Sequence, residues 1–367
     1  MREERTTTKG MEIGLYTLGD LVPNPHTNQS VSAHQRMKEI IAAAKLADEA
    51  GLDIFGVGEH HRLDYAATAP PVILAAIAQA TKNIKLTSTT TVLSTVDPVR
   101  LFEDFATLDL ISDGRAEIIA GRGAFVESFP LFGYDTKDYD ALFTENLELL
   151  LKLGETERVT WEGQFRSSLS DAEVAPRPIQ QQLPIWIGVG GTLESAVRAG
   201  RSGLGMAIAM LGGDPRRFQP LAEAYREAGR QAGYNSEQLK IGITGHGYIG
   251  RTSQQAMDEF YPYYRNYWTY FNRQRGMAFN MTRADFEQMA SPETALFVGS
   301  PQQITEKILR QHELFGHQRF LAQIDIGGLP YRQVAETIEL IASEIAPVVR
   351  RETSKTLASS ALERVGT

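Results

Sequence analysis

Residues 97–123, DPVRLFEDFATLDLISDGRAEIIAGRG, contain one complete helix–strand unit. Asp97 and Pro98 are residue types favoured at a helix N-cap and at the first helical position. We expect this helix to run to about Ser112 and to stop before Asp113-Gly114. Residues 116–120 then form a predicted strand. The number of such units along the chain predicts the fold.

The same alternation of short strand and longer helix continues along most of the chain. Strands are predicted at 12–16, 54–58, 84–93, 116–120, 184–189, 204–210, 240–249 and 320–326, each followed by a helix. Eight such units are the number in a (β/α)8 barrel. We therefore predict an α/β TIM barrel with excursions after strands four and seven. A doubly wound sheet, the alternative, needs fewer strands and a switch point.

Two segments do not fit the repeating unit. Residues 154–183 are polar with scattered glycine and proline, and we expect them to be irregular. Residues 253–299 begin as a helix and are rich in aromatic residues between 261 and 271. Because aromatic side chains dominate cores and interfaces, we expect this run to pack on the barrel or on a partner subunit. The alternative is that it closes over a site.

These segments also set the expected domain limits. We expect a single barrel domain over residues 11–350. A disordered extension over residues 1–10 precedes it, and a polar tail over residues 351–367 follows. No secretory signal is expected at the start, since the first ten residues contain no apolar run.

Composition narrows the function. The 367 residues include 37 Lys and Arg against 45 Asp and Glu, for a net charge of −8. A mildly acidic chain is a poor candidate for binding nucleic acid, and no apolar stretch is long enough to span a bilayer. The sequence contains no cysteine. This excludes disulfides, thiolate metal sites and catalytic thiols, and it suits a reducing cytoplasm.

In a barrel of this kind, the site lies at the C-terminal ends of the strands. His60, in Glu59-His60-His61-Arg62 after the second strand, is a candidate base or hydrogen-bond donor, since neutral imidazole accepts a proton near pH 7. A strand-end hydrogen-bond network is the alternative. We expect no metal site, because adjacent side chains point to opposite faces and His60 and His61 cannot easily share an ion.

The third and fourth strands end in residues suited to a flat or anionic ligand. Ser88, Thr89 and Thr90 are small and offer hydroxyl groups, although threonine also simply favours strands. In Gly121-Arg122-Gly123 the glycines let the backbone approach a ligand, and the guanidinium suits a phosphate. A structural salt bridge is the alternative for Arg122.

The fifth strand ends in GVGGT, residues 188–192, directly before a helix. Backbone N–H groups and the helix dipole make such a turn a candidate anion site, and a plain tight turn is the alternative. The turn lacks the third glycine of a dinucleotide fingerprint and the lysine of a P-loop. No Gly-x-Ser-x-Gly or His-Glu-x-x-His motif occurs, so hydrolase and metalloprotease functions lose their main support.

Taken together, these segments resemble the bacterial luciferase-like flavin monooxygenases. The resemblance rests on the order and spacing of GEHH (58–61), TVLSTVDPVR (91–100), SDGR (112–115), AGRG (120–123), GGT (190–192) and GSP (299–301). Each motif is modest alone, but their shared order is specific. The resemblance covers about residues 12–349.

The resemblance implies an FMN-dependent monooxygenase of the two-component type. A separate flavin reductase would supply reduced FMN, and O2 would oxidise a small organic substrate. The resemblance places the catalytic histidine at His60 and the FMN phosphate at Arg122 and Thr192. It also implies a homodimer, and a non-proline cis peptide bond that we expect at Thr89–Thr90. The implied cofactor-binding residues are Ser88, Thr89, Thr90, Gly121, Arg122, Gly190, Gly191 and Thr192.

The chain departs from luciferase itself at two places. Gly188 and Val189 stand where luciferase has acidic and hydroxyl residues, so backbone N–H groups would have to replace those side chains. Gly121 stands where luciferase has a cysteine, and we expect it to leave space beside the flavin. We do not predict light emission. Two alternatives stay open: a deazaflavin-dependent oxidoreductase on the same barrel, and a non-catalytic flavin-binding protein or assembly partner.

Overall fold

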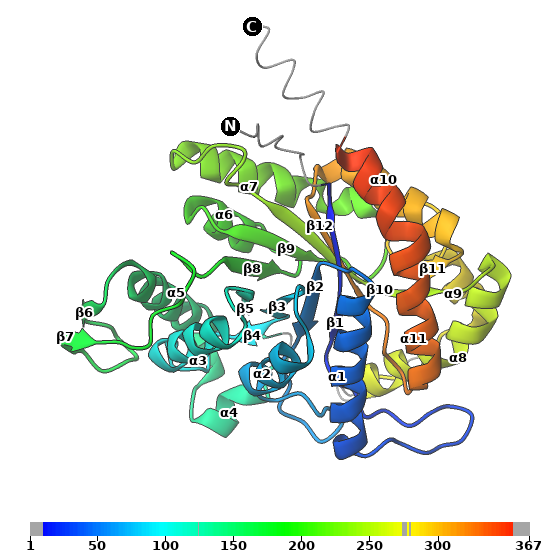
Figure 1. The fold of residues 1–367 in the computed structure, drawn as a ribbon, viewed down its shortest axis with the longest axis horizontal. Helices are drawn as coiled ribbons and strands as arrows, with labels where there is room; N and C mark the ends of the chain where they lie inside the picture. Colours follow the sequence, from blue (N-terminus) through cyan, green and yellow to red (C-terminus); the bar gives the residue numbers. More distant parts are fainter. Residues whose placement is uncertain (1–9, 124, 274–276, 279, 355–367) are drawn as a thin grey trace, which may run out of the picture.

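The protein folds as a closed barrel of parallel strands, seen in a computed structural model that describes residues 10–354 except 124, 274–276 and 279 (Figure 1). The strands pair in a ring, and the last pairs with the first. Their order is β1 (Glu12–Thr17), β2 (Ile54–Val57), β3 (Lys85–Ser88), β5 (Ala116–Gly121), β8 (Ile185–Val189), β9 (Gly205–Ala209), β10 (Ile241–Ile249) and β12 (Arg319–Gln323). The predicted (β/α)8 barrel is confirmed.

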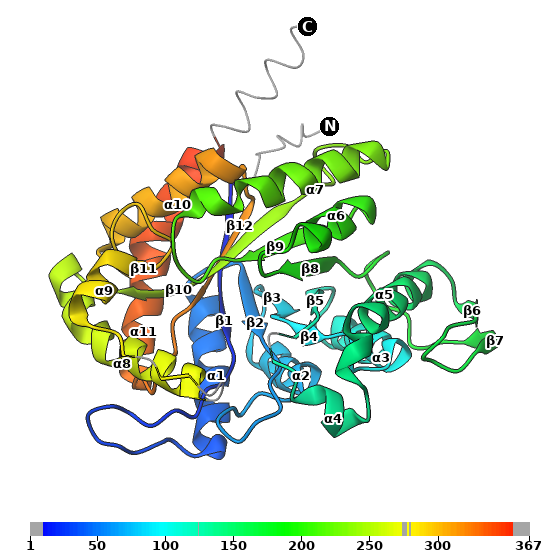
Figure 2. The ribbon, with the colours of Figure 1, turned by 180° about the vertical axis from the view of Figure 1, so that it is seen from behind.

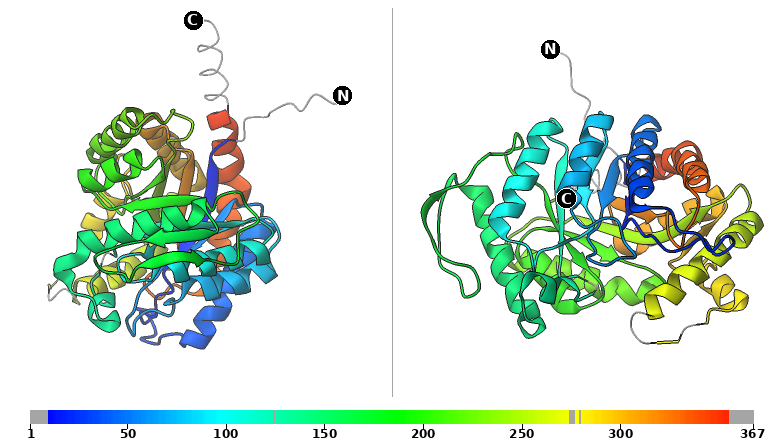
Figure 3. Two further views of the ribbon diagram at one scale, coloured as in Figure 1. Left: turned by 90° about the vertical axis from the view of Figure 1, so that its left-hand side faces the viewer. Right: turned by 90° about the horizontal axis from the view of Figure 1, so that it is seen from below.

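Helices surround the barrel on its outside (Figure 3, right panel). Asp97 caps α3 as expected, since its carboxylate accepts the N–H groups of Val99 and Arg100. The covering helices are α1 (Ala33–Glu49), α2 (Pro70–Ala80), α3 (Pro98–Ile111), α5 (Tyr139–Glu155), α6 (Leu193–Arg201), α7 (Gln219–Gln231), α10 (Pro301–Phe315) and α11 (Tyr331–Leu340).

The excursion after β5 is more ordered than predicted. Residues 154–183, expected to be irregular, contain an antiparallel hairpin of β6 (Arg158–Trp161) and β7 (Leu169–Glu173), which lies outside the barrel (Figure 2). Most of its residues are exposed or half-buried, so no apolar alternation marks the strands in the sequence. The short helix α4 (Ser128–Phe132) precedes α5 in the same excursion.

The excursion after β10 contains the long aromatic helix. It consists of α8 (Ser253–Arg273), α9 (Arg283–Met289) and β11 (Phe297–Gly299), which pairs with the end of β10. The predicted third strand is also divided, since β4 (Thr91–Val92) is separate from β3 and pairs with β5. Among the described residues, no helix is both long and apolar enough to cross a membrane.

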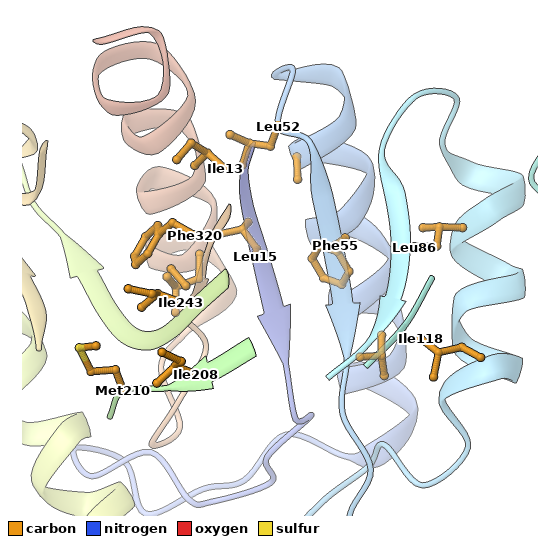
Figure 4. Packing of buried hydrophobic residues seen from close by; sticks show 14 of the residues in the cluster. Ile13, Leu15, Leu52, Phe55, Leu86, Ile118, Ile208, Met210, Ile243 and Phe320 are labelled. Atoms are coloured by element: carbon orange, nitrogen blue, oxygen red, sulfur yellow. The ribbon is translucent and has the colours of Figure 1, made fainter. Parts of the chain in front are cut away.

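The main hydrophobic core fills the space between the barrel and the helices. Along each strand, side chains alternate between the helices and the barrel interior. Ile13 and Leu15 of β1, Phe55 of β2, Leu86 of β3 and Ile118 of β5 belong to this outward layer (Figure 4) and are all 2% exposed or less. Burying a side chain of this kind contributes roughly 1.5–3 kcal/mol, so this layer holds the helices on the barrel.

At the N-terminal end, the inward-facing residues are charged instead. Arg319 of β12 is 2% exposed and donates hydrogen bonds to Glu12 of β1 at 2.8 Å and to Glu117 of β5 at 2.7 Å. Its guanidinium carbon lies 4.2 Å from the centre of the Trp186 ring. Lys85 of β3 also reaches Glu12, at 2.7 Å. Burial opposes ionisation of Glu12, but the charges of Arg319 and Lys85 lower its pKa to about 2.

The closing helix extends past the predicted end of the domain at residue 350. It passes through a π-helical turn (Ile341–Ile345) and continues to Ser354. The buried hydroxyl of Thr353 accepts a hydrogen bond from the Met11 N–H at 2.9 Å. Residues 351–354 therefore belong to the barrel rather than to a tail. Residues 1–9 and 355–367 lie outside the described residues, and the domain limits stay a prediction.

The charged layer predicts a large loss of stability from one substitution. Arg319→Met should lower the free energy of unfolding by about 3 kcal/mol, because it leaves the Glu117 carboxylate buried with Lys85 as its remaining cation. Urea unfolding at pH 7 measures this. The matched control is Arg332→Met, which removes an exposed pair with Glu336 on α11 and should cost less than about 0.5 kcal/mol. Equal losses in the two variants would contradict the role of the layer.

The same layer predicts a pH dependence. Because the folded protein lowers the pKa of Glu12 to about 2, this group stabilises the fold above its unfolded pKa of about 4.3. Its contribution is lost as the pH falls toward 2. Urea unfolding between pH 5 and pH 2.5 should therefore show a steeper loss of stability in the wild type than in Glu12→Gln. Parallel curves would count against a lowered pKa at Glu12.

Candidate active site

A cavity of about 530 Å³ opens at the C-terminal end of the barrel. This is the end where such barrels carry their sites, and the volume suits a small molecule or cofactor. One wall comes from the ends of β2, β5 and β8, and the other from β10, β12 and α8. The predicted site residues in its lining are His60, Thr89, Thr90, Gly121, Arg122 and Gly190.

The side chains of Thr89 and Thr90 lie close to the backbones of β2, β5 and β8. The peptide bond between them is cis, as the resemblance implied. A Cβ atom added to Gly56, Gly121 or Gly188 would lie 2.5 to 2.8 Å from a side-chain atom of Thr89 or Thr90. Glycine at these positions is therefore required by the close approach of the threonines. The expectation that Gly121 leaves space beside the flavin is wrong, because the Thr90 side chain occupies that space.

Ser88 lies outside the cavity lining. Its fully buried hydroxyl donates to the carbonyl of Ile119 and accepts the Ile119 N–H, both at 3.2 Å. Both capacities of the hydroxyl are thus used to join β3 to β5. The structure does not bring Ser88 together with the other predicted cofactor residues.

His60 is nearly buried and is held by a residue that sequence reasoning missed. Its Nδ1 lies 3.3 Å from Oε1 of Glu127, in the segment between β5 and α4. The imidazole also packs on Tyr65, with ring centres 4.3 Å apart, and on Phe125 at 5.3 Å. Burial opposes ionisation of Glu127, but its hydrogen bond to His60 and the charge of Arg62 lower its pKa. A carboxylate therefore orients the imidazole.

His61 is engaged by a different acid. Its Nε2 lies 2.7 Å from Oε1 of Glu59, whose other oxygen accepts the Val92 N–H at 2.9 Å. Each histidine thus has its own carboxylate. In the described part of the chain, no group of three or more His, Cys, Asp or Glu side chains gathers as the ligands of a metal ion would.

Arg122 reaches from the end of β5 to the N-terminus of α6. Its guanidinium donates to Ser195 Oγ at 3.0 Å and to Thr192 Oγ1 at 3.3 Å, and pairs with Asp140 on its other side. A Cβ added at Gly190 or Gly191 would have no atom within 4 Å. The cation, the two hydroxyls and the helix N-terminus therefore converge beside open space, which is the arrangement that binds an anion.

Arg198 adds a second guanidinium that sequence reasoning missed. It lies over the Phe143 ring at 5.2 Å, and its buried Nη1 has no hydrogen-bond partner among the described residues. Burial and then the nearby charge of Arg122 lower its pKa. On α6, Arg198 follows Ser195 by three residues and so shares its face, a spacing that could have revealed it. Although Arg198 stands in the last turn of α6, it lies near enough to Arg122 for the two charges to interact, so a doubly charged anion beside Arg122 would also feel the charge of Arg198.

The aromatic helix α8 packs on the barrel and also contributes to the cavity. Tyr264 of the predicted aromatic run is fully buried, so the expected packing on the barrel is confirmed for this residue. Tyr267 and Phe271, further along the helix, line the cavity. The ring of Phe271 meets that of Phe125 with centres 5.1 Å apart. The end of the helix thus gives one side of the site an apolar wall.

The chain belongs to the luciferase-like monooxygenase family, whose model matches residues 11–318. The oxygenase component of the flavin-dependent trigonelline monooxygenase of Acinetobacter baylyi is 24% identical over 345 residues, which cover 87% of this chain and 92% of that protein. The crystal structure of the monooxygenase RslO1 from Streptomyces bottropensis is similar, with a TM-score of 0.80 and 26% identity over 92% of this chain and 99% of that one.

Two further structures share the fold at lower identity. One is the FMN complex of the oxygenating constituent of 3,6-diketocamphane monooxygenase from Pseudomonas putida, with a TM-score of 0.73 and 22% identity over 92% of this chain and 98% of that one. The other is an F420-dependent secondary alcohol dehydrogenase, with a TM-score of 0.72 and 17% identity over 93% and 99%. The resemblance to luciferase-like monooxygenases is confirmed at the level of family and enzyme class, while the cofactor differs among these neighbours.

Proposed function

We propose that this protein is an FMN-dependent monooxygenase that uses reduced flavin and O2 to oxidise a small organic substrate. The observation that carries the proposal is the convergence of Arg122, Thr192 and Ser195 beside an open glycine turn, at the rim of a cavity that also contains His60. When bound, reduced FMN supplies the electrons that activate O2, so that one oxygen atom enters the substrate and the other leaves as water.

We call the group of Arg122, Thr192, Ser195 and Arg198 the anion cluster, because it is suited to binding an anion. This group fits the phosphate of FMN. A phosphate monoester carries close to two negative charges at neutral pH, and two guanidinium groups can balance them. Thr192 and Ser195 offer hydroxyls, and the N–H groups at the start of α6 point toward the same place. The predicted roles of Arg122, Gly190, Gly191 and Thr192 in cofactor binding are therefore kept in the proposal, with Ser195 and Arg198 added.

The surface next to the anion cluster favours FMN over a deazaflavin. The deazaflavin carries a longer acidic tail that would extend past the phosphate. The groove that adjoins Arg122 is lined by Glu145, Glu148 and Glu162. These carboxylates would repel an acidic tail. The deazaflavin-dependent oxidoreductase therefore stays the second candidate, supported by the shared fold with an F420-dependent enzyme.

His60 is the proposed catalytic residue. The Glu127 carboxylate accepts a hydrogen bond from Nδ1–H, which leaves Nε2 of the neutral imidazole as the nitrogen able to take a proton from the substrate or from water. Phe125 and Phe271 shield the cavity with their rings, so water is partly excluded from the proton transfer. This pairing of an oriented histidine with an apolar wall is the feature that a non-catalytic flavin-binding protein would not need.

The remaining partners belong to the same proposal. A separate flavin reductase would supply the reduced FMN, in keeping with the oxygenase component to which the chain is similar. A homodimer is supported by exposed apolar residues, namely Val72 on α2, Leu110 and Ile111 on α3, and Leu131 and Phe132 on α4. The absence of cysteine from the sequence supports a cytoplasmic location.

The phosphate contact can be tested with two flavins. Arg122→Ala should weaken FMN binding roughly tenfold to a hundredfold, because a charged hydrogen bond contributes about 1.5–3 kcal/mol. Riboflavin, which lacks the phosphate, should bind within about threefold of the wild type. Arg198→Met should show the same pattern in fluorescence titrations. Arg216→Ala, which removes an exposed guanidinium paired with Asp214, is the control. Equal weakening of both flavins would mean that Arg122 does not hold the phosphate.

The role of His60 can be tested by oxygen labelling. With reduced FMN and 18O2, mass spectrometry over a panel of small organic substrates should find products that contain one 18O atom. His60→Ala should lower product formation about a hundredfold and change FMN affinity less than about threefold. Glu127→Gln should lower product formation about tenfold, and the exposed Glu148→Gln should not. Flavin binding without labelled product from any substrate would favour the non-catalytic alternative.

A further inference from the structure

Three polar side chains form a row along the cavity, away from the anion cluster. In the sheet register, Tyr16 of β1 pairs with Gln323 of β12, and Gln323 pairs with His246 of β10. Side chains in register on adjacent parallel strands point to the same face, and all three residues line the cavity. We call Tyr16, Gln323 and His246 the polar row.

Two members of the polar row, Gln323 and His246, are buried with polar atoms that no described residue hydrogen-bonds, whereas the Tyr16 side chain forms a hydrogen bond with Thr244. Gln323 and His246 are each 1% exposed. Within the described part of the chain, both amide atoms of Gln323 and Nδ1 of His246 have no hydrogen-bond partner. Leaving a buried polar group unsatisfied costs about 1–3 kcal/mol, and such groups are uncommon in folded proteins. These unpartnered atoms are explained if a bound ligand supplies the missing hydrogen bonds.

The polar row lies on the far side of the barrel from the anion cluster. In the ring order, β12 is four strands from β5 in either direction, and Arg122 directly follows β5. The anion cluster and the polar row therefore lie on opposite walls of one cavity. A second ligand, or a part of a ligand remote from the phosphate, is what the polar row would contact.

The surroundings of His246 in the polar row are aromatic, while Asp325 lies near Tyr16 at the other end of the row. Tyr264 and Tyr267 place ring centres 5.9 and 5.2 Å from that of His246. Burial lowers the pKa of His246 to about 3, so its imidazole is neutral at neutral pH. Burial also raises the pKa of Tyr16 above its ordinary value. The charged residues of the cavity lining, Glu59, Arg122 and Glu127, come from the β2 and β5 side and have their own partners.

We propose that the polar row binds the carbonyl or hydroxyl group of an uncharged, ring-containing substrate. The Gln323 amide can donate to an oxygen or accept from a hydroxyl, and neutral His246 can do either. Tyr267 and Phe271 offer the aromatic faces on which a ring packs. A carboxylate or sulfonate is disfavoured, because Arg122 is the only lysine or arginine among the described residues of the lining and lies on the opposite wall, while Asp325 lies near Tyr16, so the desolvation of an anion would not be offset. This inference rests on the proposed function, since it assigns the substrate class of the same cavity.

Three naphthalene derivatives of matched shape test the inference. They are 2-acetylnaphthalene (a ketone), 2-ethylnaphthalene (its apolar counterpart) and 2-naphthoate (an anion). Equilibrium dialysis measures their binding to the full-length protein, with and without saturating oxidised FMN. The wild type should bind the ketone about tenfold more tightly than the ethyl compound, and the anion least tightly.

Substitutions in the polar row should remove the preference for the ketone. In Gln323→Met, which keeps the volume, the ketone and the ethyl compound should bind within about twofold of each other, and FMN affinity should stay unchanged. His246→Phe should reduce the preference as well. Thermal unfolding of Gln323→Met should occur at or above the wild-type temperature, because an unsatisfied amide is removed; a purely structural glutamine would give a loss. The control is Gln302→Met on the exposed face of α10.

Three results would overturn the inference. The first is equal binding of the ketone and the ethyl compound to the wild type. The second is a ketone preference that survives in both Gln323→Met and His246→Phe. The third is a Gln323→Met variant in which FMN binding weakens as much as ketone binding, which would place the flavin ring on the polar row. Failure of the wild type to bind FMN would count against the proposed function, while the measurements without FMN would still decide the inference.

Discussion

The buried guanidinium of Arg319 determines how the barrel closes. A buried charge without a partner costs several kcal/mol, so Arg319 requires Glu12 and Glu117 beside it. These acids stand on β1, the neighbouring strand, and on β5, across the ring. A shift of β12 by one residue would turn the guanidinium out of the barrel and leave both acids inside. The ion pairs therefore fix the strand register, and the register fixes which residues face inward at the other end.

Along each strand, every second side chain points into the barrel, from the charged layer at the N-terminal end to the cavity at the C-terminal end. On β12 they are Arg319, Leu321 and Gln323, and on β5 they are Glu117, Ile119 and Gly121. Leu321 and Ile119 belong to an apolar layer that separates the charges from the cavity. The next layer, at the C-terminal ends of the strands, has different residues in the two halves of the ring. Glycines on β2, β5 and β8 make room for Thr89 and Thr90, and the polar row occupies β1, β12 and β10.

The sequence predicts those features whose signals are local. The eight strand–helix units, His60 and the pair of Arg122 and Thr192 all follow from short motifs and their order. Features that depend on distant parts of the chain could not be found in this way. Glu127 lies in an irregular segment, and its role appears only when that segment folds over His60. The expectation of open space beside Gly121 is wrong because Thr90, which lies between β3 and β4, fills that space. The hairpin at 158–173 is mostly exposed, so its strands lack the apolar alternation that buried strands show.

The two ends of the barrel differ in how completely their polar groups are satisfied. At the N-terminal end, Arg319 has carboxylate partners on two strands. At the C-terminal end, Gln323, His246 and Arg198 keep buried atoms without partners among the described residues. Unpartnered atoms also occur in Gln311 and His317 near α10, but those residues do not line the cavity. An unsatisfied group at a cavity is one that a ligand can satisfy, so its cost to folding is recovered on binding. The well-paired end of the barrel supplies the stability that lets the other end stay incomplete.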